Sequence, residues 1–204
     1  GWFDALRAAE DPGAALAALG RFRILCALRR GPLGVAGFNA AVEAALFPNP
    51  TLLPRHYHLR PILVTQNDYR LRLYNGDIGV IFEERDGDEV RLRACFPSTG
   101  DDRDGVRRYA PSQLPPHETS YAMTIHKSQG SEFDHVLVVL PEEGTEGEQR
   151  LLARELIYTG VTRARKGVEI WGQPEMLAAA VSRGTRRYSG LPERLRACRS
   201  IDAS

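Results

Sequence analysis

Residues 121–141 read YAMTIHKSQGSEFDHVLVVLP, with polar residues enclosed between two strongly apolar runs. Residues 121–125 and 135–140 each have the composition of a buried strand. We therefore expect residues 126–134 to lie at the end of a strand. In parallel α/β sheets, ligands bind at the edge where the strands end. The stretch predicts an α/β fold with a ligand site at the edge of a parallel sheet.

Several residues of this stretch have the chemistry that such a site needs. Gly130 lets the backbone approach a ligand closely, while Lys127, Gln129 and Glu132 supply donors and acceptors for phosphate, ribose or a neighbouring domain. The stretch is not a phosphate-binding loop, because the GxxxxGKS/T spacing occurs neither here nor elsewhere in the chain. His126 alone would more often be a structural histidine than a ligand.

A second informative stretch, RELIYTGVTRARKGVEIWG, covers residues 154–172. Apolar residues at helical spacing predict a helix over 151–164, and VEIW predicts a strand over 168–171. Arg163 falls where the helix gives way to the strand, so its guanidinium can project from the edge of the domain. An arginine presented to a γ-phosphate neutralises charge during phosphoryl transfer. For a lone arginine, a surface salt bridge is the simpler role. The presence of the 126–134 stretch in the same chain favours the second role, an arginine finger that contacts the γ-phosphate.

The rest of the chain divides by texture. Residues 1–20 are helical and broken at 11–13, and residues 21–28 suit a strand. PILVT at 61–65 is typical of a buried strand of a parallel sheet. Residues 75–116 differ, since short β-rich runs separated by Gly and Asp predict a small β-barrel insert.

Composition bounds the function only loosely. The formal net charge is +1, although 25 of the 27 basic residues are arginine, which suits phosphate recognition and is equally expected from a GC-rich genome. Cys26, Cys95 and Cys198 show no metal-binding spacing and predict buried thiols in a reducing cytoplasm. No apolar run approaches the roughly 18 residues of a membrane span. The start at Gly1 suggests a cut inside a longer protein, or removal of an initiator methionine.

Residues 121–141 resemble motif V, and residues 154–172 motif VI, of superfamily-one DNA helicases. The residues of both motifs resemble those of the RecD family, the alpha subunits of bacterial exodeoxyribonuclease V. So do two further stretches, PILVTQNDYRLRLYNGDIGV at 61–80 and RILCALRRGPLGVAGFN at 23–39. The resemblance runs over nearly the whole chain and is weakest at 1–20 and 98–105. It implies a RecA-like parallel sheet flanked by helices, the second helicase motor domain, with a small SH3-like β-barrel insert.

The resemblance assigns roles to matching positions. Arg163 matches the arginine finger, and Gln129, Gly130 and Glu132 match positions beside the nucleotide, with Glu132 a candidate for the ribose. Lys127 and Ser128 could contact either the nucleotide or the DNA. Of the two, we group Lys127 with the nucleotide contacts and Ser128 with the DNA contacts. The single-stranded DNA side comprises Thr124 and His126, and Asn67 is a further candidate. One departure is Gln66, which stands where relatives often carry an arginine.

The resemblance also implies how the chain is divided into domains and which domain holds the nucleotide. Residues 1–20 form a lead-in, residues 21–74 and 117–204 the motor domain, and residues 75–116 the insert. ATP and Mg²⁺ are held mainly by a first motor domain, whose Walker A and acidic motifs this chain lacks, so this chain alone is expected to be inactive. Expected partners are single-stranded DNA or duplex ends and that first domain. Assembly with RecB and RecC stays open against a free-standing RecD-like helicase. The implied motion is five-prime to three-prime, in the cytoplasm, within a complex for DNA repair and recombination.

Two other classes of function are possible from the residues. A RecA-like binding module without a motor role would have lost Arg163 or the 126–130 loop, and both are present. A nuclease could use Asp101, Asp102 and Asp104 as metal ligands. These acids lie in a Gly-flanked turn without a supporting lysine or histidine, which favours a solvated loop and no metal site.

Overall fold

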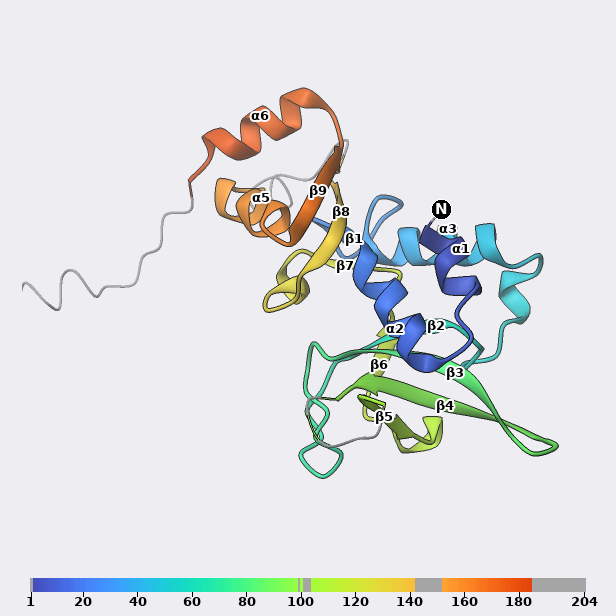
Figure 1. Cartoon of the computed structure of the whole chain (residues 1–204). Helices are drawn as coiled ribbons and strands as arrows, with labels where there is room; N and C mark the ends of the chain where they lie inside the picture. Colours follow the sequence, from blue (N-terminus) through green and yellow to red (C-terminus); the bar gives the residue numbers. More distant parts are fainter. Residues whose placement is uncertain (1, 99, 101–103, 142–151, 185–204) are drawn as a thin grey trace, which may run out of the picture.

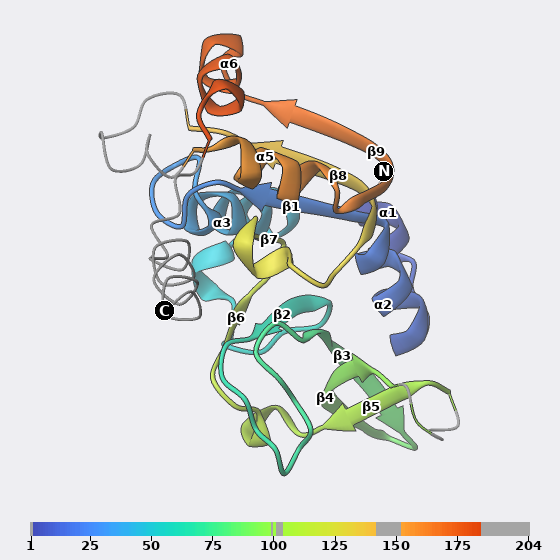
Figure 2. The ribbon, with the colours of Figure 1, turned by 90° about the vertical axis from the view of Figure 1, so that its left-hand side faces the viewer.

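A computed structural model describes residues 2–98, 100, 104–141 and 152–184, and these residues form two sheets (Figure 1). One sheet is four-stranded and parallel, and the other is five-stranded and antiparallel. Figure 2 shows them stacked, with the parallel sheet above and the antiparallel sheet below.

The parallel sheet has the strand order β7-β1-β8-β9. Its strands are β1 (Phe22–Cys26), β7 (Ala122–Thr124), β8 (Phe133–Val139) and β9 (Ala164–Trp171). Each neighbouring pair is parallel. The predicted α/β class and its three late strands are therefore confirmed, although β9 begins earlier than residue 168.

Helices cover both faces of the parallel sheet because side chains alternate along its strands. Ile24 and Cys26 point toward α3 (Val35–Leu46), and this face contains Leu137 and Val139. The intervening Leu25 belongs to the opposite face, with Val136 and Val138. That face packs against α5 (Arg154–Val161) and α6 (Pro174–Ser182). The sheet is thus the middle layer of a three-layer domain.

The N-terminal residues form α1 (Trp2–Arg7) and α2 (Pro12–Arg21), as the sequence predicts. The helix α2 begins sharply because Asp11 is its N-cap, accepting a hydrogen bond from Ala14 N at 2.8 Å, and because Pro12 occupies the first turn. Leu6, Ala15 and Leu19 pack on Val80 and Phe82 of the antiparallel sheet. This lead-in therefore belongs to the core of the molecule.

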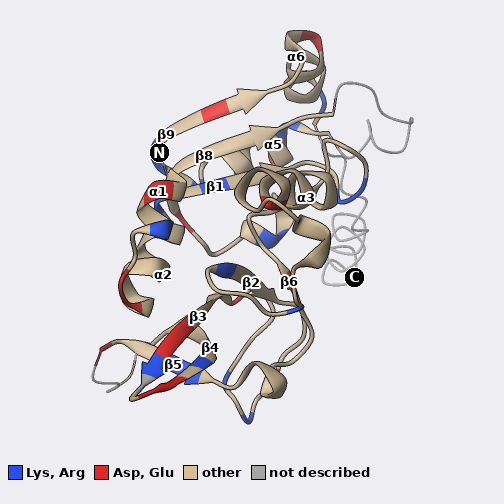
Figure 3. Cartoon of the chain, turned by 90° about the vertical axis from the view of Figure 1, so that its right-hand side faces the viewer, with Lys and Arg blue, Asp and Glu red and all other residues tan. Residues whose placement is uncertain are grey.

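The antiparallel sheet has the order β5-β4-β3-β2-β6. Its strands are β2 (Arg60–Val64), β3 (Ile78–Asp86), β4 (Glu89–Pro97), β5 (Val106–Tyr109) and β6 (His117–Thr119), with 3-10 turns η1 (Pro50–Leu52) and η2 (Pro111–Gln113) nearby. Acidic and basic residues are interspersed over β3, β4 and β5 (Figure 3). Its exposed surface thus has no single sign of charge.

The prediction that PILVT forms a strand of the parallel sheet is wrong. β2 pairs antiparallel with β3 and with β6. Its side chains nevertheless serve two cores, because Ile62 and Val64 pack within the antiparallel sheet while Leu63 joins the core under α5. A strand buried on both faces has an apolar sequence in either kind of sheet, so composition alone could not distinguish them.

The antiparallel sheet extends beyond residues 75–116 in both directions, since β2 and β6 flank that range. The division of the chain into modules stays a prediction. The connection from β6 to β7 is short, so the two sheets share the segment 117–124. No helix within the described residues is long and apolar enough to cross a membrane.

Gly79 of β3 is expected to tolerate no side chain. A Cβ there would lie 2.7 Å from the Cys95 carbonyl oxygen and 2.7 Å from ring carbons of Phe96, within the sheet. We expect Gly79→Ala to lower the free energy of unfolding by about 1–3 kcal/mol through overpacking. Urea unfolding measures this. Gly20→Ala in α2 is the matched control, since its Cβ would meet nothing within 4 Å, and a similar loss there would contradict the steric explanation.

Acid is expected to destabilise the fold through a histidine pair. His56 Nε2 and His117 Nε2 lie 3.2 Å apart, and His117 Nδ1 lies 2.8 Å from the Pro115 carbonyl oxygen, which can only accept. In the neutral pair, His117 Nε2 therefore accepts from His56. Burial lowers the pKa of both rings, and nearby Arg60 lowers both further.

Because both pKa values lie below the unfolded value of about 6.5, the unfolded chain binds more protons in acid. We therefore expect stability to fall as the pH drops through and below about 6.5. His56→Gln should make this fall shallower, measured as urea midpoints across that range. An unchanged slope would contradict a role for the pair.

Candidate functional site

The loop between β7 and β8 crosses the parallel sheet from one edge to the other. Thr124 ends β7 beside Cys26 of β1, and Cys26 is paired in turn with Val139 of β8, at the carboxyl ends of the strands. The chain then forms η3 (His126–Ser128) and enters β8 at Phe133, at the amino ends. The prediction of a single edge therefore holds only for the first residues of the loop. Since β7 and β8 are parallel, their connection must traverse the sheet.

The turn after η3 depends on Gly130. Its φ of +85° lies in the left-handed region, and nothing lies within 4 Å of where a Cβ would be. Ser131 N closes the turn onto Ser128 O at 3.0 Å. The glycine is therefore needed for backbone conformation. Gln129 and Glu132 are exposed on either side of it.

Arg163 packs against this same loop. It follows α5 and immediately precedes β9, as predicted. Its half-buried guanidinium donates to Ser131 O at 3.2 Å, Thr159 O at 3.2 Å and Thr162 Oγ1 at 3.3 Å. The backbone is tied in as well, since Phe133 N donates to Arg163 O at 2.8 Å. The side chain thus lies folded along the loop instead of projecting freely from the domain.

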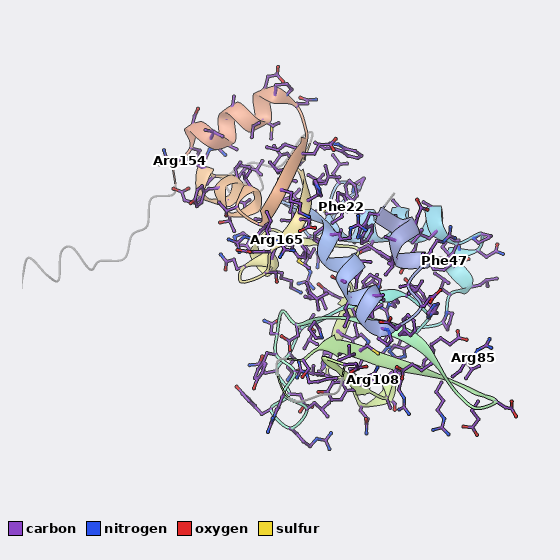
Figure 4. The ribbon with its side chains drawn as sticks, in the orientation of Figure 1. Phe22, Phe47, Arg85, Arg108, Arg154 and Arg165 are labelled. Carbon is purple, nitrogen blue, oxygen red and sulfur yellow. The ribbon has the colours of Figure 1, made fainter. Side chains whose placement is uncertain are left out.

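Unlike the basic residues that follow it, Arg163 has no acidic partner among the described residues. Arg165 and Lys166 both pair with Asp134, at 3.0 and 2.8 Å, and Figure 4 shows Arg165 at the start of β9. These cations lower the pKa of Asp134, the Lys166 hydrogen bond most. Within the part of the chain that the structure describes, Arg163 instead donates only to neutral oxygens, so its positive charge remains available to an anion.

Lys127 lies away from Arg163, on the side of the antiparallel sheet. Its Nζ pairs with Glu118 Oε1 of β6 at 2.7 Å, and Arg29 pairs with the other oxygen of Glu118 at 3.2 Å. The ammonium therefore links the loop to β6. This contact gives Lys127 a structural role whether or not it also meets a ligand.

The candidates for the DNA side, except Asn67, lie near the carboxyl edge of the parallel sheet. His126 is exposed, and Thr124 is half-buried with its Oγ1 3.3 Å from Lys127 N. Ser128 is buried and donates to Ile125 O at 2.7 Å, so it is the least accessible candidate. Asn67 lies outside this loop, after β2, where its Oδ1 accepts from Asn75 N at 2.8 Å.

Two buried polar residues that position the loop are absent from the predicted site. Asn39 of α3 donates to Thr119 O and Ala122 O at 3.1 and 3.2 Å and accepts from Ala122 N at 2.9 Å. This one amide fixes the backbone that leads into Thr124. Its only sequence signal was a polar residue among small apolar ones.

Arg23 of β1 is the second, at 1% exposure. It donates to Leu19 O at 3.2 Å and to Ser120 O, and its guanidinium lies 4.9 Å from the centroid of the Phe133 ring. Burial lowers its pKa to about 10, which still leaves it charged at neutral pH. The alternation of Arg and apolar residues at 21–24 predicts a strand and does not show which of its arginines is buried.

Within the described residues, no group of three or more His, Cys, Asp and Glu side chains could hold a metal ion. Asp101 and Asp102 lie outside those residues, and Asp104 pairs with Arg108. Cys26 and Cys95 are free and buried, as predicted, and burial raises the pKa of each thiol to about 12. Cys198 and the arginines of the C-terminal tail lie outside the described residues.

The chain is similar in sequence to helicase proteins. Residues 119–170, which include η3 and Arg163, match the UvrD-like helicase C-terminal domain. RecD of the RecBCD enzyme from Mycolicibacterium smegmatis is 45% identical over 188 residues, 91% of this chain and 31% of that protein. RecD from Haemophilus influenzae is 38% identical over 83% of this chain and 24% of its own length. The RecD2 DNA helicase of Deinococcus radiodurans is 31% identical over 87% of this chain and 24% of its own length.

Among solved structures, Bacteroides Pif1 bound to ADP-AlF3 and single-stranded DNA covers 98% of this chain at 16% identity, with a TM-score of 0.46. The sequence match assigns residues 119–170 to the UvrD-like helicase C-terminal domain family. More particularly, the chain is a RecD homologue over most of its length. It spans about 31% of the length of the first of these relatives.

Proposed function

We propose that this chain is the second motor domain of an ATP-dependent DNA helicase of the RecD type. The complete helicase, meaning this chain joined to a first motor domain with Walker A and acidic motifs, would hold ATP and Mg²⁺ mainly on that first domain. This chain would add Arg163 and a grip on single-stranded DNA. Motion would be five-prime to three-prime, by resemblance alone.

The observation that carries the proposal is the placement of Arg163. Among the described residues, its half-buried guanidinium donates only to neutral oxygens, including Ser131 O at 3.2 Å, on the loop that carries Gln129, Gly130 and Glu132. A phosphate is a stronger acceptor than a peptide carbonyl, so the guanidinium can exchange Ser131 O for phosphate oxygens. We assign Arg163 as the arginine finger and the exposed Gln129 and Glu132 as nucleotide contacts.

Coupling would follow from the path of the loop. The finger contacts the loop at the amino edge of the sheet, whereas Thr124 and His126 lie toward the carboxyl edge. A shift of Ser131 when Arg163 engages phosphate would be passed along a few residues to η3. That displacement would change the hold on DNA, and alternating grip gives translocation.

We expect His126→Ala to weaken binding of single-stranded DNA by the complete helicase about threefold or more, since an exposed side chain on the DNA path would lose a stacking or phosphate contact. Nucleotide affinity should stay unchanged. Fluorescence anisotropy with labelled oligo(dT) measures the first and a fluorescent nucleotide the second. His135→Ala, an exposed histidine on β8, is the matched control. Equal DNA binding by wild type and His126→Ala would remove this residue from the DNA side.

We infer further features that rest on the same resemblance. The antiparallel sheet would correspond to the SH3-like module. The complete helicase would bind duplex ends and could assemble with RecB and RecC. It would act in DNA repair and recombination in the cytoplasm. Co-purification with RecB and RecC separates assembly from a free-standing helicase. A binding module without motor function is the alternative, and the intact Arg163 and η3 loop favour the motor.

A further inference from the structure

Two tyrosines stand exposed on the loop between β2 and β3. Tyr69 is 76% exposed and Tyr74 is 46% exposed. Their rings touch edge to face, with centroids 6.2 Å apart and planes at 73°. Single exposed aromatics are common on protein surfaces, but a contacting pair on one loop presents a larger apolar face to solvent.

Hydrogen bonds fix the backbone of this loop. Asp68 and Leu73 form a two-way bridge, with N–O distances of 2.7 and 3.0 Å. The Leu73 side chain is fully buried, and Tyr109 Oη donates to Leu71 O at 2.8 Å from β5. The rings are therefore held on an ordered support, which lowers the entropic cost of binding a partner.

One residue of the loop has a sparsely populated backbone conformation. Arg72 has a φ of +53°, in the left-handed region, and its carbonyl accepts from Arg107 Nη1 at 2.7 Å. Such conformations cost free energy and persist where the surroundings determine them, often at binding sites. Here the conformation lies between the two tyrosines.

The loop carries two aspartates and two arginines, and their side chains differ in exposure and partners. Asp68 and Asp77 are half-buried and accept from the backbone at Leu71 N and Tyr74 N, at 3.0 and 2.9 Å. Arg70 and Arg72 are exposed, and neither pairs with an acid among the described residues. Aromatic faces beside unpaired arginines suit a polyanion with stackable bases, which is the chemistry of single-stranded nucleic acid.

The start of the loop is linked to the η3 turn through the segment that contains β6. At its start, Thr65 N donates to Pro116 O at 2.8 Å, and the adjoining β6 carries Glu118, which pairs with Lys127 of η3 at 2.7 Å. Figures 1 and 2 show the loop below the η3 turn in both views. β6 therefore connects the start of the loop to the η3 turn.

We propose that Tyr69 and Tyr74 form a base-stacking platform for single-stranded DNA, with Arg70 and Arg72 as phosphate contacts. This inference rests on the proposed helicase function. It adds a second point of hold outside the η3 loop, on the segment that enters the antiparallel sheet.

The test compares the complete helicase bound to oligo(dT) and to an abasic oligomer of equal length, by anisotropy. Stacking contributes only where bases are present, so Tyr69→Ala and Tyr74→Ala should each weaken oligo(dT) binding about fivefold or more. Abasic binding should stay unchanged, and Tyr69→Phe should keep wild-type affinity. Arg70→Ala should weaken the binding of both oligomers. It should also lower the slope of log affinity against log salt concentration by about one released ion. Arg91→Ala, an exposed arginine paired with Glu89 on β4, is the surface control.

The possible failures are distinct. If the tyrosine variants keep the wild-type preference for bases while His126→Ala loses affinity, the platform is wrong and the helicase function stands. If the wild-type protein binds neither oligomer at low salt, the proposed function fails and the platform fails with it. Both rings are largely exposed, so the variants should keep the wild-type thermal midpoint, and Tyr69→Phe separates lost stacking from altered folding.

Discussion

Arg163→Ala is expected to reduce DNA-stimulated ATP turnover by the complete helicase about a thousandfold or more. The variant removes a guanidinium that donates to the η3–β8 loop at Ser131 O. In the described part of the chain this guanidinium has no acidic partner, whereas Arg165 and Lys166 pair with Asp134. Nucleotide affinity should change little, because the first motor domain would hold most of the nucleotide. Steady-state ATPase and equilibrium binding of a fluorescent nucleotide measure the two quantities separately.

Arg165→Ala is the matched control for this prediction. Arg165 lies two positions along the chain, is exposed and pairs with Asp134 at 3.0 Å. Its loss should leave turnover within a few-fold of wild type, since exposed ion pairs contribute little. Near-normal turnover of Arg163→Ala would show that the finger is assigned wrongly and would favour the binding module.

Arg23→Ala is expected to destabilise the chain by about 3–5 kcal/mol. The side chain is buried and joins three segments, through Leu19 O, Ser120 O and the Phe133 ring. Its removal would leave two carbonyl oxygens without donors and a cavity between the sheets. Chemical denaturation of the variant and the wild-type chain measures the difference.

Arg23→Met is the control that separates these causes. Methionine fills much of the cavity and removes a charge whose burial is unfavourable, as the lowered pKa of about 10 indicates. We therefore expect a smaller loss than for alanine. A loss below about 1 kcal/mol for Arg23→Ala would show that the desolvation cost of the charge offsets its hydrogen bonds.

Much of the fold was predictable because its signals are local. The short, Val-rich apolar run at 135–140 favours a buried strand, and Asp11-Pro12 marks a helix start through capping and a fixed φ. The position of Arg163 between α5 and β9 was predictable for the same reason. The resemblance to RecD proteins came from two long motifs, and the similarity to RecD subunits confirms it.

Other features depend on contacts between distant residues and left no local signal. The run 61–65 is apolar because Leu63 and its neighbours enter two different cores, so its partner strands could not be read from it. Asn39 and Arg23 act on backbone about 80 and 97 residues away. The crossing of residues 124–133 between the two edges follows from the parallel direction of β7 and β8, but the order of the strands is known only from the assembled sheet.

The most direct test measures the affinity of the complete helicase for single-stranded DNA with and without a non-hydrolysable ATP analogue. If Arg163 and the DNA side are joined through residues 124–132, the analogue should change that affinity about 5- to 150-fold. The Arg163→Ala variant should show a much smaller change at saturating analogue. An unchanged wild-type affinity with the nucleotide site filled would contradict the coupling of ATP to DNA through this domain.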